Sequence, residues 1–305
     1  MAVNTRVGSR AVALDGEPSL LARALTAARR FIVRKPLGAF GATVLVLLVV
    51  AAVFAGVVAP YGENQQDTGT PLSAPSFQHW VGTDQFGRDL LSRLLYGARI
   101  SLYVGIGATL LSVIPGTALG VASAYFRGSF DAVVQRLVDA VQAVPGLILL
   151  IAIVVVLGTG VVNVVLALAV RSAVVDSRVM RSAALQIMGR DFITASRALG
   201  ASNKRMMLRH VLPNVAAPMI IVASLGFGQF ILAEASLSFL GYGVPPPAPS
   251  WGGMLAADGR SYMYAAPHMF IGPAVALSLV VFGVNMFGDA LRDVLDPRLR
   301  GSGAG

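Results

Sequence analysis

Long runs without a charged residue alternate with shorter polar segments along this chain. The uncharged runs are 36–62, 100–126, 140–170 and 261–288, and a fifth run, 211–257, is interrupted only by Glu234. Each run exceeds the roughly 20 apolar residues that a helix needs to cross a bilayer. The pattern therefore predicts an all-α integral membrane protein whose chain crosses the membrane several times.

The run 140–170 is too long for one upright membrane helix, because at 1.5 Å per residue it would extend about 46 Å. The sequence Gly158–Thr159–Gly160 interrupts it, and glycine commonly ends a helix. We therefore expect two spans here, one covering residues 133–157 and one covering residues 161–180.

The distribution of basic residues favours the same division. Lys and Arg outnumber Asp and Glu in residues 1–35 and again in 176–213, and basic loops tend to stay on the cytoplasmic side. Only a break within 140–170 places both segments there, so we expect six transmembrane helices with both termini cytoplasmic. The predicted segments are a cytoplasmic tail (1–36), a first transmembrane helix (37–60), an exterior loop (61–97), a core of five transmembrane helices (98–290) and a cytoplasmic C-terminal tail (291–305).

Composition agrees with a membrane protein. The chain is 55% hydrophobic and 13% charged, whereas soluble domains carry about 25% charged residues. A net charge of +9 would suggest nucleic-acid binding in a soluble protein, but here the positive-inside rule accounts for it. Cysteine is absent, which excludes disulfides and thiol chemistry.

Signatures of catalysis are missing from the sequence. It contains no GxxxxGK[ST] phosphate loop, no GxSxG and no HExxH motif. His79, His210 and His268 are far apart and fall in different predicted compartments, so they do not suggest a metal site. We expect no catalytic residue, no metal and no ATP hydrolysis in this chain itself.

The N-terminal tail contains an amphipathic pattern. Apolar residues from Leu20 to Ile32 share one helical face, and the opposite face carries Arg23, Arg29, Arg30 and Arg34. Such a helix is typical of segments that lie in the membrane interface. We expect an interfacial helix on the inner leaflet, with a solvated helix or disorder as the alternatives.

A basic, mostly polar segment, 191–213, lies between two of the long apolar runs. It starts with small residues, among which Thr194 can cap a helix. Gly200 is expected to end that helix, and Pro213 resists continuation of the next one. The segment therefore predicts two short helices, broken at Gly200, within the largest cytoplasmic loop.

Two charged residues lie inside predicted spans. A charge at mid-span costs about 2.5–3.5 kcal/mol on insertion scales, so each needs a polar path or a partner. Glu234, with Ser236 nearby, is either a pathway or gate residue or part of a buried hydrogen bond that joins helices. Arg171 either pairs with Glu234, lines a cytoplasmic vestibule with Arg178 and Arg181, or extends its charged end to the interface.

The exterior loops carry two further patterns. Charge is dense where the first exterior loop meets the second span, which predicts either a local ion-pair network or a solvated helix. The residues concerned are Asp84, Arg88, Asp89, Arg93 and Arg99. In the last exterior loop, three consecutive prolines followed by Trp251 predict a stiff lip at the membrane surface.

Four motifs, in order along the chain, resemble those of ABC-importer permeases. The family pattern EAA-x3-G-x9-I-x-LP is matched by Thr194-Ala195-Ser196, Gly200, His210 and Leu212-Pro213, with Thr194, Ser196 and His210 in place of Glu, Ala and Ile. The patterns at 82–102 (GTDxxGRDxxSRxxxGxRxSL), 234–241 (EASLSFLG) and 249–252 (PSWG) resemble the dipeptide, oligopeptide and nickel branch, and within it the second of two permease subunits. The resemblance covers residues 37–295.

The resemblance implies a type I ABC importer permease fold in the bacterial cytoplasmic (inner) membrane. It implies one half of a translocation pathway, a homologous second permease that completes a heterodimer, two cytoplasmic ATPase subunits that hold ATP and Mg²⁺, and an extracytoplasmic solute-binding protein. Membrane lipid surrounds the complex, and no nucleic acid takes part. In this family the loop that matches residues 191–213 docks on an ATPase subunit. The alternative is that this basic loop contacts only lipid headgroups. The residues of this ATPase-coupling loop are Thr194, Ala195, Ser196, Arg197, Ala198, Leu199, Gly200, Ala201, Lys204, Arg205, His210, Leu212 and Pro213.

The same resemblance sets the expected function. Short peptides are the expected solute, because they dominate this branch, and nickel, opines and glutathione are the alternatives. The rival from another class is a proton- or sodium-coupled secondary transporter, with Glu234 as its ion site.

Overall fold

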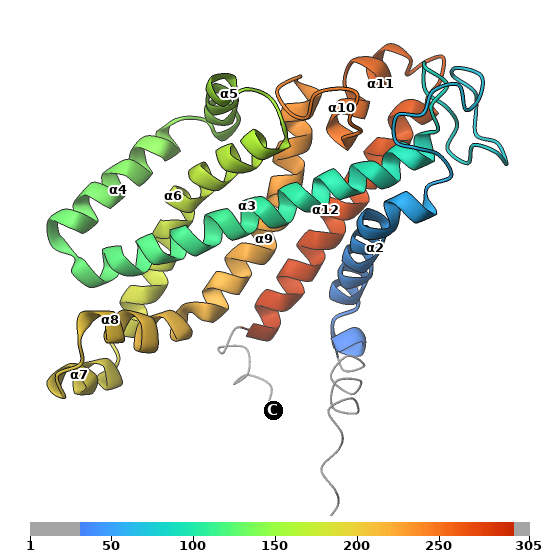
Figure 1. The fold of residues 1–305 in the computed structure, drawn as a ribbon. Helices are drawn as coiled ribbons and strands as arrows, with labels where there is room; N and C mark the ends of the chain where they lie inside the picture. Colours follow the sequence, from blue (N-terminus) through green and yellow to red (C-terminus); the bar gives the residue numbers. More distant parts are fainter. Residues whose placement is uncertain (1–30, 296–305) are drawn as a thin grey trace, which may run out of the picture. The chain divides into compact units, whose positions relative to one another are not determined.

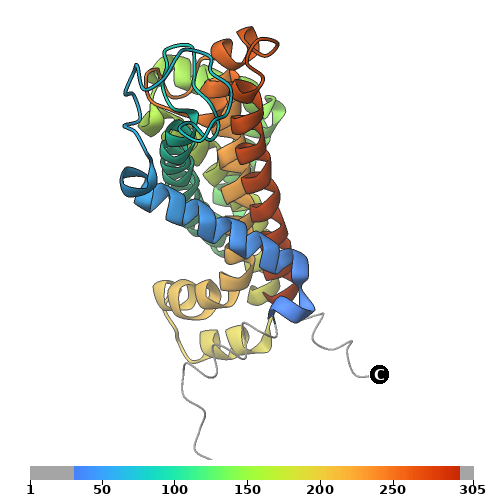
Figure 2. The same cartoon turned by 90° about the vertical axis from the view of Figure 1, so that its right-hand side faces the viewer.

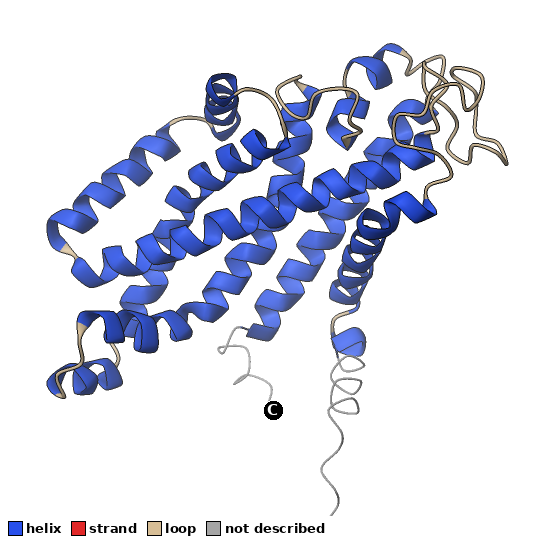
Figure 3. Ribbon diagram, viewed as in Figure 1, coloured by secondary structure: helices blue, strands red, loops and turns tan. Residues whose placement is uncertain are grey.

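The computed structural model describes residues 31–295. Figure 3 shows helices joined by loops, and within the described residues the extended structure is limited to one isolated bridge between Thr83 and Asp89. The all-α prediction is confirmed for this part of the chain. Most of the predicted interfacial helix, from Leu20 onward, and the end of the C-terminal tail lie outside the described residues.

The helices follow one another as labelled in Figure 1. They are α2 (Pro36–Val58), α3 (Leu90–Phe126), α4 (Gly128–Ala143), α5 (Gly146–Leu157), α6 (Val161–Met188), α7 (Asp191–Ala198), α8 (Asn203–Arg205), a π-helical turn (Met206–Val211), a 3₁₀ turn (Leu212–Val215), α9 (Ala216–Phe239), α10 (Trp251–Leu255), α11 (Ala257–Ser261) and α12 (His268–Leu295). Within residues 37–295, α7 and α10 lie at opposite ends of the long helices, and these ends are called here the α7 end and the α10 end.

Four helical stretches in the described residues are long and apolar enough to cross a membrane, or five if the α4–α5 pair counts as one bent span. The six expected spans are therefore found only in part. The predicted span 161–180 does form one helix, α6, but Arg171, Asp176 and Arg178 in its middle make it too polar to qualify by composition.

The predicted break in the run 140–170 is confirmed. Helix α5 ends at Leu157 and α6 begins at Val161. Gly158 and Gly160 adopt φ values of +89° and +134°, which glycine tolerates and other residues rarely adopt. The two helices therefore separate where the glycines permit the backbone to turn.

The expected span over residues 133–157 is not one continuous helix. Helices α4 and α5 meet at an angle of 96°. Val144, between them, has an extended backbone (φ −93°, ψ 130°), as expected for a residue that precedes a proline. Pro145 cannot donate a backbone hydrogen bond, so the chain bends at this dipeptide.

Part of the predicted exterior loop, 61–97, is helical. Helix α3 begins at Leu90, after Asp89, whose side chain accepts a hydrogen bond from the backbone N–H of Ser92. This cap starts the helix earlier than the edge of the uncharged run. The charged residues Arg93 and Arg99 therefore belong to α3 rather than to a loop.

Small residues bring α3 and α6 into close contact. A Cβ atom on Gly120 would lie 2.4 Å from the backbone oxygen of Ser177, and one on Gly116 would lie 2.9 Å from that of Ala173. Such close approach is typical of membrane helices that pack through small residues. In Figure 1, α3 crosses α6 and α9, and its principal partner is α6.

Two further contacts complete the bundle. Figure 2 shows α2 crossing α12, where a Cβ atom on Gly41 would lie 2.2 Å from the backbone oxygen of Gly283. Polar contacts hold α4 to α6, because Arg181 binds both carboxylate oxygens of Asp131 and Arg178 pairs with Asp139. These pairs give Arg178 and Arg181 of α6 acidic partners on α4.

We expect Gly120→Ala to destabilise the protein by about 1–3 kcal/mol, because the added methyl group meets backbone that cannot move aside. Gly56→Ala is the matched control, since the nearest atom to its Cβ would be the Tyr96 hydroxyl at 3.8 Å. Thermal denaturation of the purified protein in detergent compares the two. Equal melting temperatures would contradict the close α3–α6 packing.

Candidate functional site

The α7 segment, residues 191–213, contains the predicted helix break. Helix α7 ends at Ala198, and Gly200 adopts a φ of +77° with no atom near its missing Cβ. The break at Gly200 is confirmed. The expected cap at Thr194 is wrong, because α7 begins at Asp191 and Thr194 lies inside it.

Pro213 does not stop the second helical piece as expected. The chain stays helical from Asn203 to Phe239, passing through a π-helical turn and a 3₁₀ turn into α9. Pro213 lies in the first turn of the 3₁₀ piece, where its missing N–H is tolerated. The carbonyl of His210 accepts a hydrogen bond from the side chain of Asn214 at 2.7 Å, so it does not lack a partner.

Buried apolar side chains anchor the α7 segment. Ile193, Met206 and Val211 are fully buried in one cluster with residues from the C-terminal half of α3 and from α6. Within the segment, the Ser196 hydroxyl lies 3.1 Å from Nε2 of His210. The segment is therefore attached firmly to the membrane helices.

The outer surface of the same segment is exposed and partly apolar. Leu199 is 88% exposed, and Phe192 and Leu208 are also exposed. Basic and small exposed residues surround them, namely Thr194, Ala195, Arg197, Ala198, Lys204 and Arg205. Apolar residues gathered among polar ones on a surface mark protein interaction sites, so this face is suited to a protein partner.

Glu234 lies at the opposite end from the α7 segment. It is completely buried and precedes the end of α9 by five residues, so the expectation of a mid-span position is wrong. Its Oε1 accepts a hydrogen bond from Ser238 at 2.6 Å. Ser250 lies nearby, but without the geometry of a hydrogen bond to Oε2, which has no partner among the described residues.

Ser238 extends this contact to the loop that follows. Its hydroxyl also accepts a hydrogen bond from the backbone N–H of Val244 at 3.1 Å. The hydroxyl of Ser236, by contrast, donates to the carbonyl of Leu232 on its own helix. Of the two expected roles for Glu234, this geometry resembles the buried contact that joins α9 to its neighbours.

Arg171 lies beside the bend between α4 and α5. Its guanidinium group occupies the space next to Gly146, where a Cβ atom would lie 2.6 Å from Nη2. Its Nε is buried with no hydrogen-bond partner among the described residues. Of the three expected roles of Arg171, the pair with Glu234 is not formed among the described residues. Arg171 instead interacts electrostatically with Asp176.

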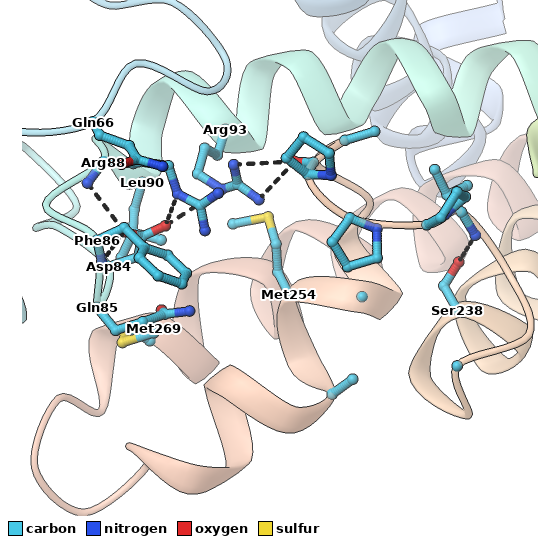
Figure 4. Close-up of a pocket in the computed structure, with 18 of the residues that line it drawn as sticks. Gln66, Asp84, Gln85, Phe86, Arg88, Leu90, Arg93, Ser238, Met254 and Met269 are labelled. Carbon is cyan, nitrogen blue, oxygen red and sulfur yellow. Dashed lines mark hydrogen bonds and ion pairs between the residues drawn. The ribbon is translucent and has the colours of Figure 1, made fainter.

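Charged residues from the loop before α3 and from its first turn form a buried cluster at the α10 end (Figure 4). Asp84 accepts a hydrogen bond from Nε of Arg88 at 2.5 Å and from the backbone N–H of Phe86 at 2.8 Å. Nε of Arg93 lies 3.7 Å from the same carboxylate. Asp84, Arg88 and Arg93 are at most 7% exposed, so the predicted ion-pair network exists for these three residues.

The other two members of the predicted network have different partners. Asp89 caps α3 and lies 2.9 Å from Nδ1 of His79. Arg99 donates to the carbonyl of Ala52 at 3.0 Å and so links α3 to α2. The sequence did not predict the contact between His79 and Asp89. The two residues are ten positions apart, and their spacing does not show that the loop brings them together.

Trp251 is 3% exposed, so its expected place at the membrane surface is wrong. Its Nε1 donates to the carbonyl of Leu94 at 3.0 Å, and its ring covers Gly97 of α3. His268, also at the α10 end, has Nε2 3.2 Å from the carbonyl of Thr83. His79 and His268 therefore lie at the same end of the bundle, not in the different compartments that the sequence predicted.

The chain matches two family models. The model described as binding-protein-dependent transport system inner membrane component matches residues 116–301. The model described as the N-terminal TM domain of oligopeptide transport permease C matches residues 25–75.

Curated proteins and solved structures also resemble this chain. The glutathione transport system permease protein GsiD of Escherichia coli O6:K15:H31 (strain 536 / UPEC) is 41% identical over 269 residues, 88% of each chain. GsiD of Shigella boydii serotype 4 gives the same values. A chain of the inward-facing MetNI methionine ABC transporter superposes with a TM-score of 0.56 at 20% identity, covering 68% of this chain and 98% of that chain. At this identity the structural likeness shows the fold alone.

We expect Asp84→Asn to destabilise the α10 end by about 3–5 kcal/mol, because it removes the carboxylate from two buried arginines. Asp67→Asn is the matched control, since Asp67 belongs to the same loop and is exposed. Limited proteolysis between α2 and α3 measures the effect. Equal cleavage rates for both variants would show that the cluster does not hold the loop.

Proposed function

Since the chain belongs to the family of binding-protein-dependent transport system inner membrane components, in the dipeptide, oligopeptide and nickel branch of ABC importers, we propose that it forms half of a translocation pathway for short peptides. The α7 segment is the single observation that supports this most strongly. It combines a buried anchor with an exposed face of apolar and basic residues.

The exposed face is suited to an ATPase subunit. Leu199 and Phe192 provide apolar surface that a groove can bury, and Arg197 can pair with acidic groups on its rim. Two ATPase subunits, one for each permease, hold ATP and Mg²⁺. This chain contributes no catalytic group to ATP hydrolysis.

Movement of α7 can reach the membrane helices by two connections. The buried side chains of Ile193 and Met206 press against α3 and α6, and the helical path from Asn203 continues into α9. When ATP draws the ATPases together, each docked α7 segment moves with its partner. The membrane helices then tilt, and the cavity between the two permeases changes from inward to outward access.

The orientation follows from this docking. The α7 end and both termini face the cytoplasm, and the α10 end faces the solute-binding protein outside the bacterial inner membrane. The basic residues of 176–213 support this orientation.

A homologous second permease completes the pathway as a heterodimer. Arg171 is the residue of α6 proposed to line it, because a cation at this depth needs a polar surface. We assign Glu234 and Ser236 to the outer gate region, where Glu234 joins α9 to the loop that follows it.

Peptides are the proposed solute for two reasons. The N-terminal family model is named for an oligopeptide permease, and the curated relatives carry glutathione, which is itself a short peptide. Nickel and opines are the alternatives that the same branch offers.

Co-purification tests the docking role of the α7 segment. We expect Leu199→Asp to lose the ATPase subunits from the detergent-extracted complex, because a charge replaces apolar surface at the contact. Phe77→Asp is the matched control, since Phe77 is also fully exposed but lies in the loop before α3. The second permease is expected to remain bound to both variants.

Two results would contradict these proposals. If the ATPases co-purify equally with both variants, the α7 segment is not the docking surface. If no ATPase co-purifies with the unaltered chain and the purified chain moves solute without ATP, the importer function itself is wrong.

A further inference from the structure

The hydroxyl group of Ser196 on α7 contacts His210 in the π-helical turn. Its oxygen lies 3.1 Å from Nε2 of His210, and both residues are partly buried. A hydroxyl group can donate as well as accept, so this hydrogen bond can form with the imidazole in any of its protonation states. Among the described residues, it is the one side-chain hydrogen bond or ion pair that joins α7 to another element.

Two inward-facing side chains attach α7, and the other residues of this helix are exposed. Ile193 is 1% exposed and packs in the apolar cluster with residues of α3 and α6. Ser196 follows three residues later, which places it on the same side of the helix. A single attached side chain leaves a helix of eight residues able to turn about its axis, whereas two along one side prevent this. The contact of Ser196 with His210 therefore fixes the rotation of α7.

His210 gives α7 a firm support. It lies in the helical stretch that runs from Asn203 into α9. Its carbonyl oxygen accepts a hydrogen bond from the side chain of Asn214 at 2.7 Å, and the next residue, Val211, is fully buried. π-helical turns occur frequently at functional sites. The partner of Ser196 is therefore held in place by the stretch that becomes α9.

The rotation of α7 sets the direction of its exposed side chains. Phe192 is 43% exposed, and Leu199, directly after the helix, is 88% exposed. Arg197 is exposed between them. A side chain turns with the helix that carries it, so a changed rotation would move these three side chains together. The direction of the face proposed to enter the ATPase groove therefore depends on the contact between Ser196 and His210.

The two residues match each other in polarity. The family pattern that residues 191–213 resemble has Ala and Ile at these two positions, and this chain differs at both. Loss of one hydrogen-bonding partner leaves the other unpaired, whereas replacement of both by apolar groups can be nearly neutral. A joint change of the pair is thus expected to be tolerated better than a change of either residue alone.

We propose that Ser196 and His210 are positioning residues. Their hydrogen bond holds α7 at the rotation that presents its exposed side chains to the ATPase subunit. The inference rests on the proposed function, since it needs an ATPase at this face. The two side chains act through α7 and do not themselves hold the partner.

A double-mutant cycle on the assembled importer tests the pair. The variants are Ser196→Ala, His210→Ile and the two changes together. The importer is purified in mild detergent with fluorescently labelled ATPase subunits, and the dissociation rate of these subunits is measured after dilution. We expect each single change to raise this rate about fivefold, because one hydrogen bond is lost and the remaining partner is left unpaired. The double variant is expected to dissociate within about twofold of the rate of the unaltered importer.

Two further variants separate positioning from a general loss of structure. His210→Gln carries an amide that can reach Ser196, so it is expected to keep the slow dissociation. Ser182→Ala is the matched control, because among the described residues its hydroxyl bonds only to the carbonyl of Arg178 on its own helix, and no change in rate is expected. All variants are expected to keep the melting temperature of the importer, since the buried Ile193 stays in place.

The inference is wrong in either of two cases. One is an unchanged dissociation rate in both single variants. The other is that the two single effects multiply to about 25-fold in the double variant, as expected for residues that act separately. If the ATPases do not associate with the unaltered chain, the proposed function fails and this inference with it. If they associate and the cycle gives one of the two cases above, the inference alone fails.

Discussion

The close contact between α3 and α6 is the constraint on which the other parts of the bundle depend. Gly116 and Gly120 let the two backbones approach until no side-chain atom would fit between them. Because α3 is fixed along α6, its C-terminal half can cover Ile193 and Met206, which anchor the α7 segment. Its first turns likewise support Arg93, the third residue of the buried cluster at the α10 end.

Local signals in the sequence predicted the features that depend on single residue types. Glycines 158, 160 and 200 adopt positive φ values where the helices were expected to break, because few other residues tolerate that conformation. The cluster around Asp84 was one of the two alternatives suggested by the dense charge of this segment, the other being a solvated helix. Uncharged runs located α2 and α12 and most of α3 and α9, because apolar length is the main requirement for crossing a bilayer.

Features that depend on distant contacts were not predictable. The burial of Trp251 requires Gly97, which is far away in the sequence, and a tryptophan next to prolines looks the same whether lipid or protein covers it. The helix continues through Pro213 by means of a π-helical turn, which no residue pattern in the sequence predicted. The bend at Pro145 was hidden because the apolar run continues on both sides of it. The sequence offered Arg178 and Arg181 as lining of a cytoplasmic vestibule and did not show that they pair with Asp139 and Asp131 of α4.

Length makes α3 a mechanical strut. Its 37 residues extend about 55 Å at 1.5 Å per residue, well beyond a hydrocarbon layer of about 30 Å. One end of this strut contacts the buried residues that anchor the α7 segment, and the other begins at the Asp89 cap beside the buried cluster of Asp84. Pro115, near the middle, removes one backbone hydrogen bond and marks the place where the strut can bend. If α3 shifts between two positions, whatever binds at one end changes the affinity at the other by the same factor in both directions, since such coupling is reciprocal.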